Sequence, residues 1–257
     1  MPVELVLSEG RIVALILVMS RFAGLFIFLP IPGLRALPDS IRPLVALVLS
    51  IPFVLRVAVP AEELNTGLVL LWCLSEVCLG LLWGIAVHYL IEAFVLGAQF
   101  LALQAGFGYA SIIDPTTQAD AGLLQILAQL MASLLFFAGG LHRQILLLMA
   151  ESFIRIPPGV FVPQDLTADR LIALGASMLE IAARLSMPLI ALLLLIDLSL
   201  ALLGRVQSQL QLLTMIFPAK LLVSLFVLGL LSSTYARLYE VFGREVLRFL
   251  GSAVRGD

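Results

Sequence analysis

Single charged residues inside long apolar runs are the first candidates for function in this sequence. Arg21, Glu76 and Asp197 each lie among aliphatic side chains. A charge within such a segment is costly in a bilayer, so it faces protein or water and either pairs with another group or lines a conducting path. Glu76 is a possible partner of Arg21. The sequence leaves open whether such a pair is structural or takes part in conduction.

The motifs that enzymes use are missing from the sequence. It has no Gly-x-Ser-x-Gly, His-Glu-x-x-His, Cys-x-x-Cys or P-loop pattern, and its acidic residues do not form the pairs that hydrolases use. His88 and His142 are too far apart in the sequence to suggest a metal site. Cys73 and Cys78 fall on different faces of a helix. We therefore expect no catalytic residue, no metal ion and no cofactor.

A polar stretch, GFGYASIIDPTTQADAG, interrupts the apolar chain between residues 106 and 122. Pro115 disfavours the helical conformation at Asp114, so a helix is expected to end before this point. At membrane depth, polar irregular backbone survives only where protein buries it or where it lines a water-filled cavity. The stretch is therefore either an ordinary surface connection or the moving part of a pore.

The composition indicates a membrane protein with several spans, which must position these groups. Of the 257 residues, 61% are hydrophobic and only 12% are charged, and the mean hydropathy is +1.12. A net charge of −2 without a basic block gives no sign of a nucleic-acid partner. We expect an all-α fold of about six or seven long apolar helices. The apolar runs are Ile12–Leu29, Leu44–Val59, Leu68–Leu90, Ile91–Ala105, Leu123–Ala150, Leu171–Leu203 and Leu221–Leu231.

Small residues and prolines within these runs predict how the helices pack. Gly80 and Gly84 follow Glu76 at four-residue spacing, which lets two helix backbones approach closely. Leu68–Ala105 forms either one bent helix or two. Pro188 predicts a kink, because a proline lacks the amide hydrogen that a helix needs.

Polar side chains recur on two further helices. Gln125, Gln129 and Ser133 form a stripe in the long helix expected for Leu123–Ala150, suited to interhelical hydrogen bonds or to a wet lumen, and Gly139-Gly140 interrupts that helix. From Arg237 onward, charged and apolar residues fall on opposite sides. The tail is therefore an amphipathic helix, either at the membrane interface or packed on a partner.

Two classes of non-enzyme fit these features. A self-contained secondary transporter of a small solute predicts internal repeats with interrupted helices at matching positions, and the two halves show no convincing repeat. A subunit of a larger channel predicts polar helix faces that one chain cannot satisfy alone. The glutamine stripe and the isolated charges favour the channel subunit.

The order and spacing of residues along nearly the whole chain resemble the FliR/SpaR/YscT family, the export-gate subunits of flagellar and type III secretion systems. The resemblance is carried by Arg21-Phe22-Ala23-Gly24-Leu25, Pro30, Pro38, Arg42, Glu76, Gly80, Gly84, Gly97, Gln104, Gly106, Ala110, Asp114-Pro115, Phe136-Phe137, Gly140, His142, Ser152-Phe153 and Pro158-Gly159.

The C-terminal part is also similar to the small partner subunit FliQ, a helical hairpin with a glutamine-rich turn. The corresponding residues are Pro188, Gln207, Gln209, Gln211, Phe217, Pro218 and Lys220. The resemblance implies a FliP-like part over residues 1–170, a FliQ-like hairpin over 171–236 and the amphipathic tail over 237–257. Residues 204–211 depart from the family pattern, since a proline and two asparagines are replaced. We favour the flagellar over the injectisome branch.

The resemblance implies a non-catalytic subunit that forms and closes the central protein-conducting pore of an export gate. The chain would lie in the bacterial inner membrane, within a basal body, with FliP-type and FliQ-type subunits in a ring. FlhB-type and FlhA-type components, membrane lipid and unfolded protein substrates would be further partners. The plug loop would contain Gly106, Phe107, Gly108, Tyr109, Ser111, Ile112, Ile113, Asp114, Pro115, Thr116 and Thr117. Helix packing would rest on Arg21, Glu76, Gly80, Gly84 and Asp197, and the pore entrance would hold Arg205, Gln207, Gln209, Gln211 and Lys220.

Overall fold

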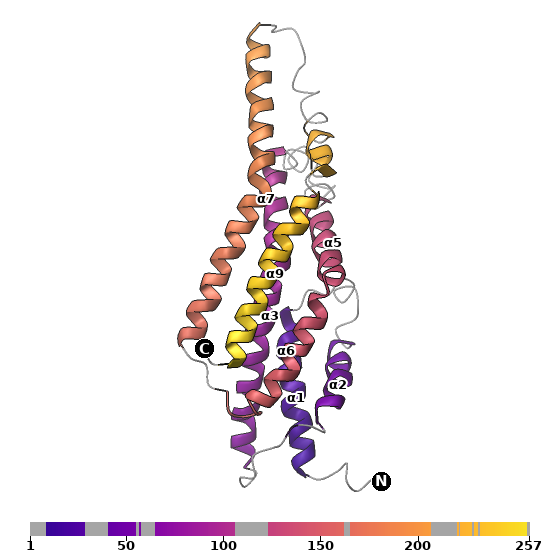
Figure 1. Ribbon diagram of the computed structural model, residues 1–257, viewed down its shortest axis with the longest axis vertical. Coiled ribbons are helices and arrows are strands. Elements are labelled where there is room, and N and C mark those ends of the chain that lie inside the picture. The colour runs from indigo at the N-terminus through magenta and orange to yellow at the C-terminus, as the bar shows by residue number, and fades with distance from the viewer. Residues whose placement is uncertain are drawn as a thin grey trace, which may run out of the picture. The chain divides into compact units, whose positions relative to one another are not determined.

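The described part of the chain is built from α-helices and contains no strand. The computed structural model describes residues 9–28, 41–54, 57, 65–105, 123–161, 165–206, 220, 222–227, 229–230 and 232–255. Its labelled helices are α1 (Glu9–Phe28), α2 (Ile41–Val54), α3 (Thr66–Ala105), α5 (Leu123–Ala138), α6 (Leu141–Arg155), α7 (Asp165–Val206) and α9 (Ser232–Arg255) (Figure 1). The expected all-α, membrane-type fold is confirmed.

These helices contribute to two units, each assembled from segments that are far apart in the sequence. Unit 1 comprises Met1–Tyr89, Phe136–Gly175 and Gly243–Asp257, and unit 2 comprises Leu90–Leu135 and Ala176–Phe242. This grouping follows contacts between residues. The division at residues 170 and 236 is based on the family resemblance and stays a prediction.

Within the described ranges, three helices are long and apolar enough to cross a membrane, namely Gly10–Phe28, Thr66–Ala105 and Ala168–Leu202. The helices α5 and α6 would supply a fourth span if they acted together, although they meet at an angle of 62°. The expected number of about six or seven long apolar helices is therefore not confirmed. How many of them cross the bilayer stays a prediction.

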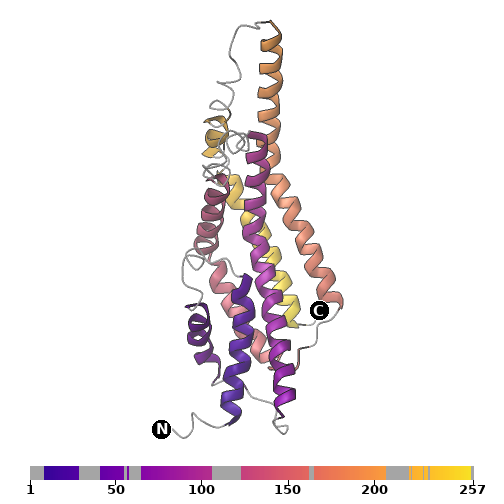
Figure 2. The same cartoon turned by 180° about the vertical axis from the view of Figure 1, so that it is seen from behind.

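The long run Leu68–Ala105 forms one helix, which settles an alternative that the sequence left open. Helix α3 has 40 residues and extends over about 60 Å, at 1.5 Å for each residue. Helix α7 is equally extended, with 42 residues, and continues through Pro188. Both views show α7 bending part-way along its length, as an internal proline predicts (Figures 1 and 2).

The prediction of a single long helix over Leu123–Ala150 is wrong. The segment forms two helices, α5 and α6, which are separated at Gly140. Gly140 has a φ of 67°, in the left-handed region that glycine enters at little cost, and its amide donates to the Phe137 carbonyl at 3.1 Å. The predicted interruption at Gly139-Gly140 is therefore a complete break. Helix α6 then ends at Arg155.

Helix α9 is amphipathic, as the tail sequence predicts, but begins at Ser232 rather than near Arg237. One face is buried and carries Tyr235, Tyr239, Phe242, Val246 and Phe249. The opposite face exposes Arg237, Glu240, Arg244 and Arg248. The apolar face is thus covered within this chain, so it requires neither a lipid interface nor a partner to bury it.

Two buried tyrosines on α9 differ in their hydrogen bonding. The Tyr235 hydroxyl donates to the Leu185 carbonyl at 3.4 Å, whereas the Tyr239 hydroxyl is buried without a hydrogen-bond partner among the described residues. Burial raises the pKa of Tyr235 to about 12 and also raises the pKa of Tyr239. Both side chains therefore stay neutral at physiological pH, and ionising them above pH 10 would oppose folding.

This contrast predicts opposite effects of removing the two hydroxyls. Tyr239→Phe should raise the free energy of unfolding by about 1 kcal/mol, because an unsatisfied buried donor is removed. Tyr235→Phe should lower it by about 1 kcal/mol, because a carbonyl loses its donor. Thermal melting of the purified chain, followed by near-ultraviolet circular dichroism, compares the two. A clear loss of stability in Tyr239→Phe would show that its hydroxyl has a partner.

Candidate functional site

A buried ion pair joins the two charges that the sequence singles out in α1 and α3. The Nε atom of Arg21 lies 2.5 Å from Oε2 of Glu76, and both side chains are 0% exposed. The remaining guanidinium nitrogens are also occupied: Nη1 donates to Oγ of Ser152 at 3.0 Å, and Nη2 donates to the Ile156 carbonyl at 3.1 Å. The guanidinium carbon stands 4.3 Å from the centre of the Phe153 ring. One cation therefore connects α1, α3 and α6.

The carboxylate of Glu76 holds the turn that follows α6. Its Oε1 accepts a hydrogen bond from the Gly159 amide at 2.9 Å. Gly159 has a φ of 87°, and a Cβ at this position would lie 2.8 Å from the Trp72 ring. The Ser75 hydroxyl also donates to the Phe161 carbonyl at 2.8 Å. Both carboxylate oxygens of Glu76 are thus occupied, and the turn is fixed against α3.

Aromatic rings cover this polar cluster on one side. Phe22 of α1, Phe53 of α2 and Phe153 of α6 are in mutual contact, with ring centres 5.3 to 6.0 Å apart. Apolar rings beside a fully buried ion pair keep water away, which strengthens the attraction and raises the cost of leaving either charge alone. The contacts of Arg21 and Glu76 favour a structural role over a direct part in conduction.

Glycines bring α1 and α3 into backbone contact next to the ion pair. A Cβ on Gly80 would lie 2.1 Å from the Arg21 carbonyl oxygen, and a Cβ on Gly24 would lie 2.4 Å from the Val77 carbonyl oxygen. At Gly84 the closest atom would be the Leu25 carbonyl oxygen, at 2.7 Å. No side chain larger than hydrogen fits at these three positions while the helices keep this separation.

A second charged cluster lies in unit 2, around Asp197 of α7. Asp197 forms an ion pair with Nζ of Lys220, and Nε2 of Gln104 donates to its Oδ2 at 3.2 Å. The Lys220 side chain is 11% exposed and the Asp197 side chain 38%. Gln104 stands in the last turn of α3, directly before the polar stretch 106–122. This cluster ties the end of α3 and the segment around residue 220 to α7.

Several predicted site residues lie in parts of the chain outside the described residues. The expected plug loop, residues 106–122, lies outside the described residues, as do Gln207, Gln209 and Gln211. The backbone of Arg205 belongs to the last turn of α7. In the stripe on α5, Ser133 is buried and its hydroxyl has no hydrogen-bond partner within the described ranges. Among the residues that the structure describes, no three histidine, cysteine or acidic side chains gather as metal ligands would.

Sequence reasoning did not predict several contacts in these clusters, among them that of Gly159 with Glu76 in the first and the pairing of Lys220 with Asp197 in the second. A signal for the pairing exists, since Lys220 is the only charged residue between Arg205 and Arg237. A carboxylate within an apolar helix needs a cation, and the hairpin expected for residues 171–236 would return this lysine to α7. No comparable signal marks the amide of Gly159.

Comparison with known proteins extends over almost the whole chain. Residues 12–245 match the sequence model of a family described as "Bacterial export proteins, family 1". The flagellar biosynthetic protein FliR of Bacillus subtilis (strain 168) is 30% identical over 219 residues, 84% of each chain. FliR of Escherichia coli (strain K12) is 25% identical over 239 residues, covering 91% of this chain and 90% of that protein. FliR of Aquifex aeolicus (strain VF5) is 25% identical over 224 residues.

Proposed function

This chain belongs to family 1 of the bacterial export proteins, and from that membership we propose that it is a non-catalytic component of a flagellar export apparatus. In this role it forms and closes the pore through which unfolded proteins leave the cell. The observation that carries the proposal is the match over residues 12–245, together with similarity to FliR proteins along most of both chains. We propose that the chain lies in the bacterial inner membrane.

The arrangement of the helices supports a gating role for residues 106–122. Helix α3 ends at Ala105 and α5 begins at Leu123, so the polar stretch connects the ends of two apolar helices. Gln104, at the end of α3, is held by Asp197. In our proposal this anchored stretch is the plug, with Ile112-Ile113 making the closed constriction too apolar for water and ions.

The exposed apolar faces support assembly with other membrane subunits. Leu44, Val48 and Ile51 of α2 are each 57% exposed, and α5 and α7 carry further exposed leucines. Large apolar surfaces of this kind mark contacts with lipid or with partner proteins. We propose FliP-type and FliQ-type subunits as the ring partners and FlhB-type and FlhA-type components as further contacts. Arg205, Gln207, Gln209, Gln211 and Lys220 are proposed to lie at the pore entrance.

Ion leakage tests the plug directly. Residues Ser111–Ala119 are replaced by a glycine–serine linker of equal length, so that the connection between α3 and α5 is kept while its side chains are removed. In cells that express the complete apparatus, we expect the variant to depolarise the membrane severalfold faster than the wild type, because a protein-sized pore without its constriction passes ions. A membrane-potential dye reports the leak.

Two controls accompany this measurement. Co-purification of the variant with its partner subunits shows that the assembly still forms. Glu180→Gln, which removes one side of an exposed ion pair on α7, should leave the membrane as tight as in the wild type. An assembled linker variant that is tight and still exports protein would reduce residues 106–122 to a plain connection and overturn the gating proposal.

A further inference from the structure

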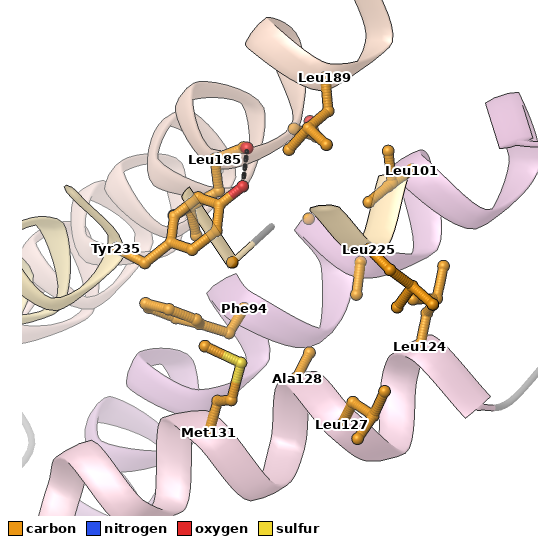
Figure 3. Close-up of a pocket in the computed structure, with 14 residues that line it drawn as sticks. Phe94, Leu101, Leu124, Leu127, Ala128, Met131, Leu185, Leu189, Leu225 and Tyr235 are labelled. Atoms are coloured by element: carbon orange, nitrogen blue, oxygen red, sulfur yellow. Dashed lines mark hydrogen bonds between the residues drawn. The ribbon is translucent and has the colours of Figure 1, made fainter. Parts of the chain in front are cut away.

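Unit 2 contains a cavity of about 220 Å³ with almost entirely apolar walls (Figure 3). Three long helices supply most of the lining, through Phe94 and Leu101 of α3, Leu124 and Met131 of α5, and Leu185 and Leu189 of α7. Figure 3 shows these side chains surrounding a common space, together with Leu225 from the helical residues 222–227. The cavity belongs to neither of the charged clusters described above.

The polar atoms of the lining are already occupied. The Tyr235 hydroxyl donates to the Leu185 carbonyl at 3.4 Å, and the Ser186 hydroxyl donates to the Ala182 carbonyl at 3.0 Å. None of the lining residues that the structure describes carries a charge. Among them the two hydroxyls are the only side-chain polar groups and both already donate, so the cavity favours apolar occupants over water or a polar solute.

The cavity has a buried floor and an exposed rim. Leu101, Leu124 and Leu189 on the floor are almost completely buried. Leu127 and Leu225, which also line the cavity, are 41% and 42% exposed. Helices α3 and α7 are both candidate membrane spans. Leu127 lies on α5, which would form a fourth span together with α6, and Leu225 lies in the helical residues 222–227. A rim of exposed leucines beside candidate spans suits hydrocarbon, where acyl tails are the abundant apolar molecules.

We propose that this cavity binds one acyl tail of a membrane phospholipid. The tail is a chain of methylene groups, which matches a lining without free donors or acceptors. It can enter between Leu127 and Leu225 without removing any polar group from water. An occupied cavity also restores the dispersion contacts that an empty one lacks. The proposal does not depend on the plug or on the conduction of protein.

Photolabelling of the full chain tests this proposal. The chain is purified in a mild detergent and reconstituted into phosphatidylethanolamine–phosphatidylglycerol vesicles that contain a phospholipid with a diazirine in its acyl tail. After irradiation, mass spectrometry locates the label. Leu130 and Leu134 on the exposed side of α5 should be labelled as surface residues. We expect additional label on Ala128 and Met131, which line the cavity.

A variant that fills the cavity separates specific from general labelling. Gly229 lines the cavity, and a Cβ there would meet no atom of another described segment within 4 Å, so a larger side chain has room. Gly229→Phe should remove most of the label from Ala128 and Met131 and leave that on Leu130 and Leu134 unchanged. The matched control is Gly251→Phe, at a helical glycine that is equally uncrowded but outside the cavity.

The wild-type measurement alone can overturn the proposal, whether or not the filled variant folds. Absence of label from Ala128 and Met131 would mean that no lipid tail enters. Loss of that label when the chain is assembled with its partners in native membranes would show that a partner's side chain occupies the cavity, which would also overturn it. Unchanged inner labelling in a folded Gly229→Phe chain would place the label outside the cavity.

Discussion

Replacing Glu76 with glutamine is expected to lower the free energy of unfolding by about 3–5 kcal/mol, because it leaves the charge of Arg21 buried without a counter-charge. Both side chains are 0% exposed, and the two carboxylate oxygens serve Arg21 and the Gly159 amide. Glutamine keeps the size of the side chain but turns one acceptor into a donor that faces another donor. Thermal or denaturant unfolding of the purified chain measures the loss.

The matched control for this substitution is Glu180→Gln. Glu180 pairs with Arg184 four residues later, at 2.5 Å, with both side chains about 60% exposed. An exposed pair of this kind contributes only about 0.3–0.5 kcal/mol. The double variant Arg21→Leu/Glu76→Leu should lose less stability than the sum of the single variants Arg21→Leu and Glu76→Leu, since it leaves no unpaired charge. Strictly additive losses would mean that the two charges do not stabilise each other.

Replacing Gly80 with alanine should cost about 3 kcal/mol, at the upper end of the usual range for overpacking. The added Cβ would lie 2.1 Å from the Arg21 carbonyl oxygen and 2.9 Å from the Leu25 amide nitrogen. Both are backbone atoms of α1, so no side-chain rotation can relieve the clash, and the two helices must separate. Separation would also stretch the Arg21–Glu76 pair. The same unfolding measurements report the effect.

Alanine substitutions at two further glycines serve as comparisons for Gly80→Ala. Gly84→Ala should be milder, because its Cβ would approach the closest backbone atom only to 2.7 Å. Gly251→Ala, in α9 with no atom of another described segment within 4 Å of the new Cβ, should raise stability by up to about 1 kcal/mol through better helix propensity. If Gly80→Ala proved as harmless as Gly251→Ala, the close crossing of α1 and α3 would be wrong.

Composition and spacing were enough to predict the fold class and part of the first cluster. The hydrophobic runs indicated helices, and the Glu76–Gly80–Gly84 spacing indicated a close helix contact. Pro188 indicated a bend in α7. These predictions depend on residues within one helix, where periodicity and covalent geometry determine the outcome.

The features that the sequence did not predict depend on segments that come into contact only after folding. Arg21 donates hydrogen bonds to Ser152 and Ile156, which are 131 and 135 residues away in the sequence. No local sequence pattern predicts these contacts. Gly139-Gly140 predicts an interruption, but the sequence does not predict the angle of 62° between α5 and α6. The tail sequence showed an apolar face without saying what covers it. The plug loop and the glutamine-rich turn lie outside the described residues and stay predictions.

The length of α3 has a consequence for the chain before it is assembled. The helix extends over about 60 Å, whereas the hydrocarbon layer is about 30 Å thick. Lipid can therefore cover only about half of this mainly apolar helix, and only 33% of its most apolar stretch is buried within the chain. A newly synthesised copy without its partners thus presents apolar surface to water, which chaperones and proteases recognise. The cellular abundance of this chain would then be set by the supply of its partners.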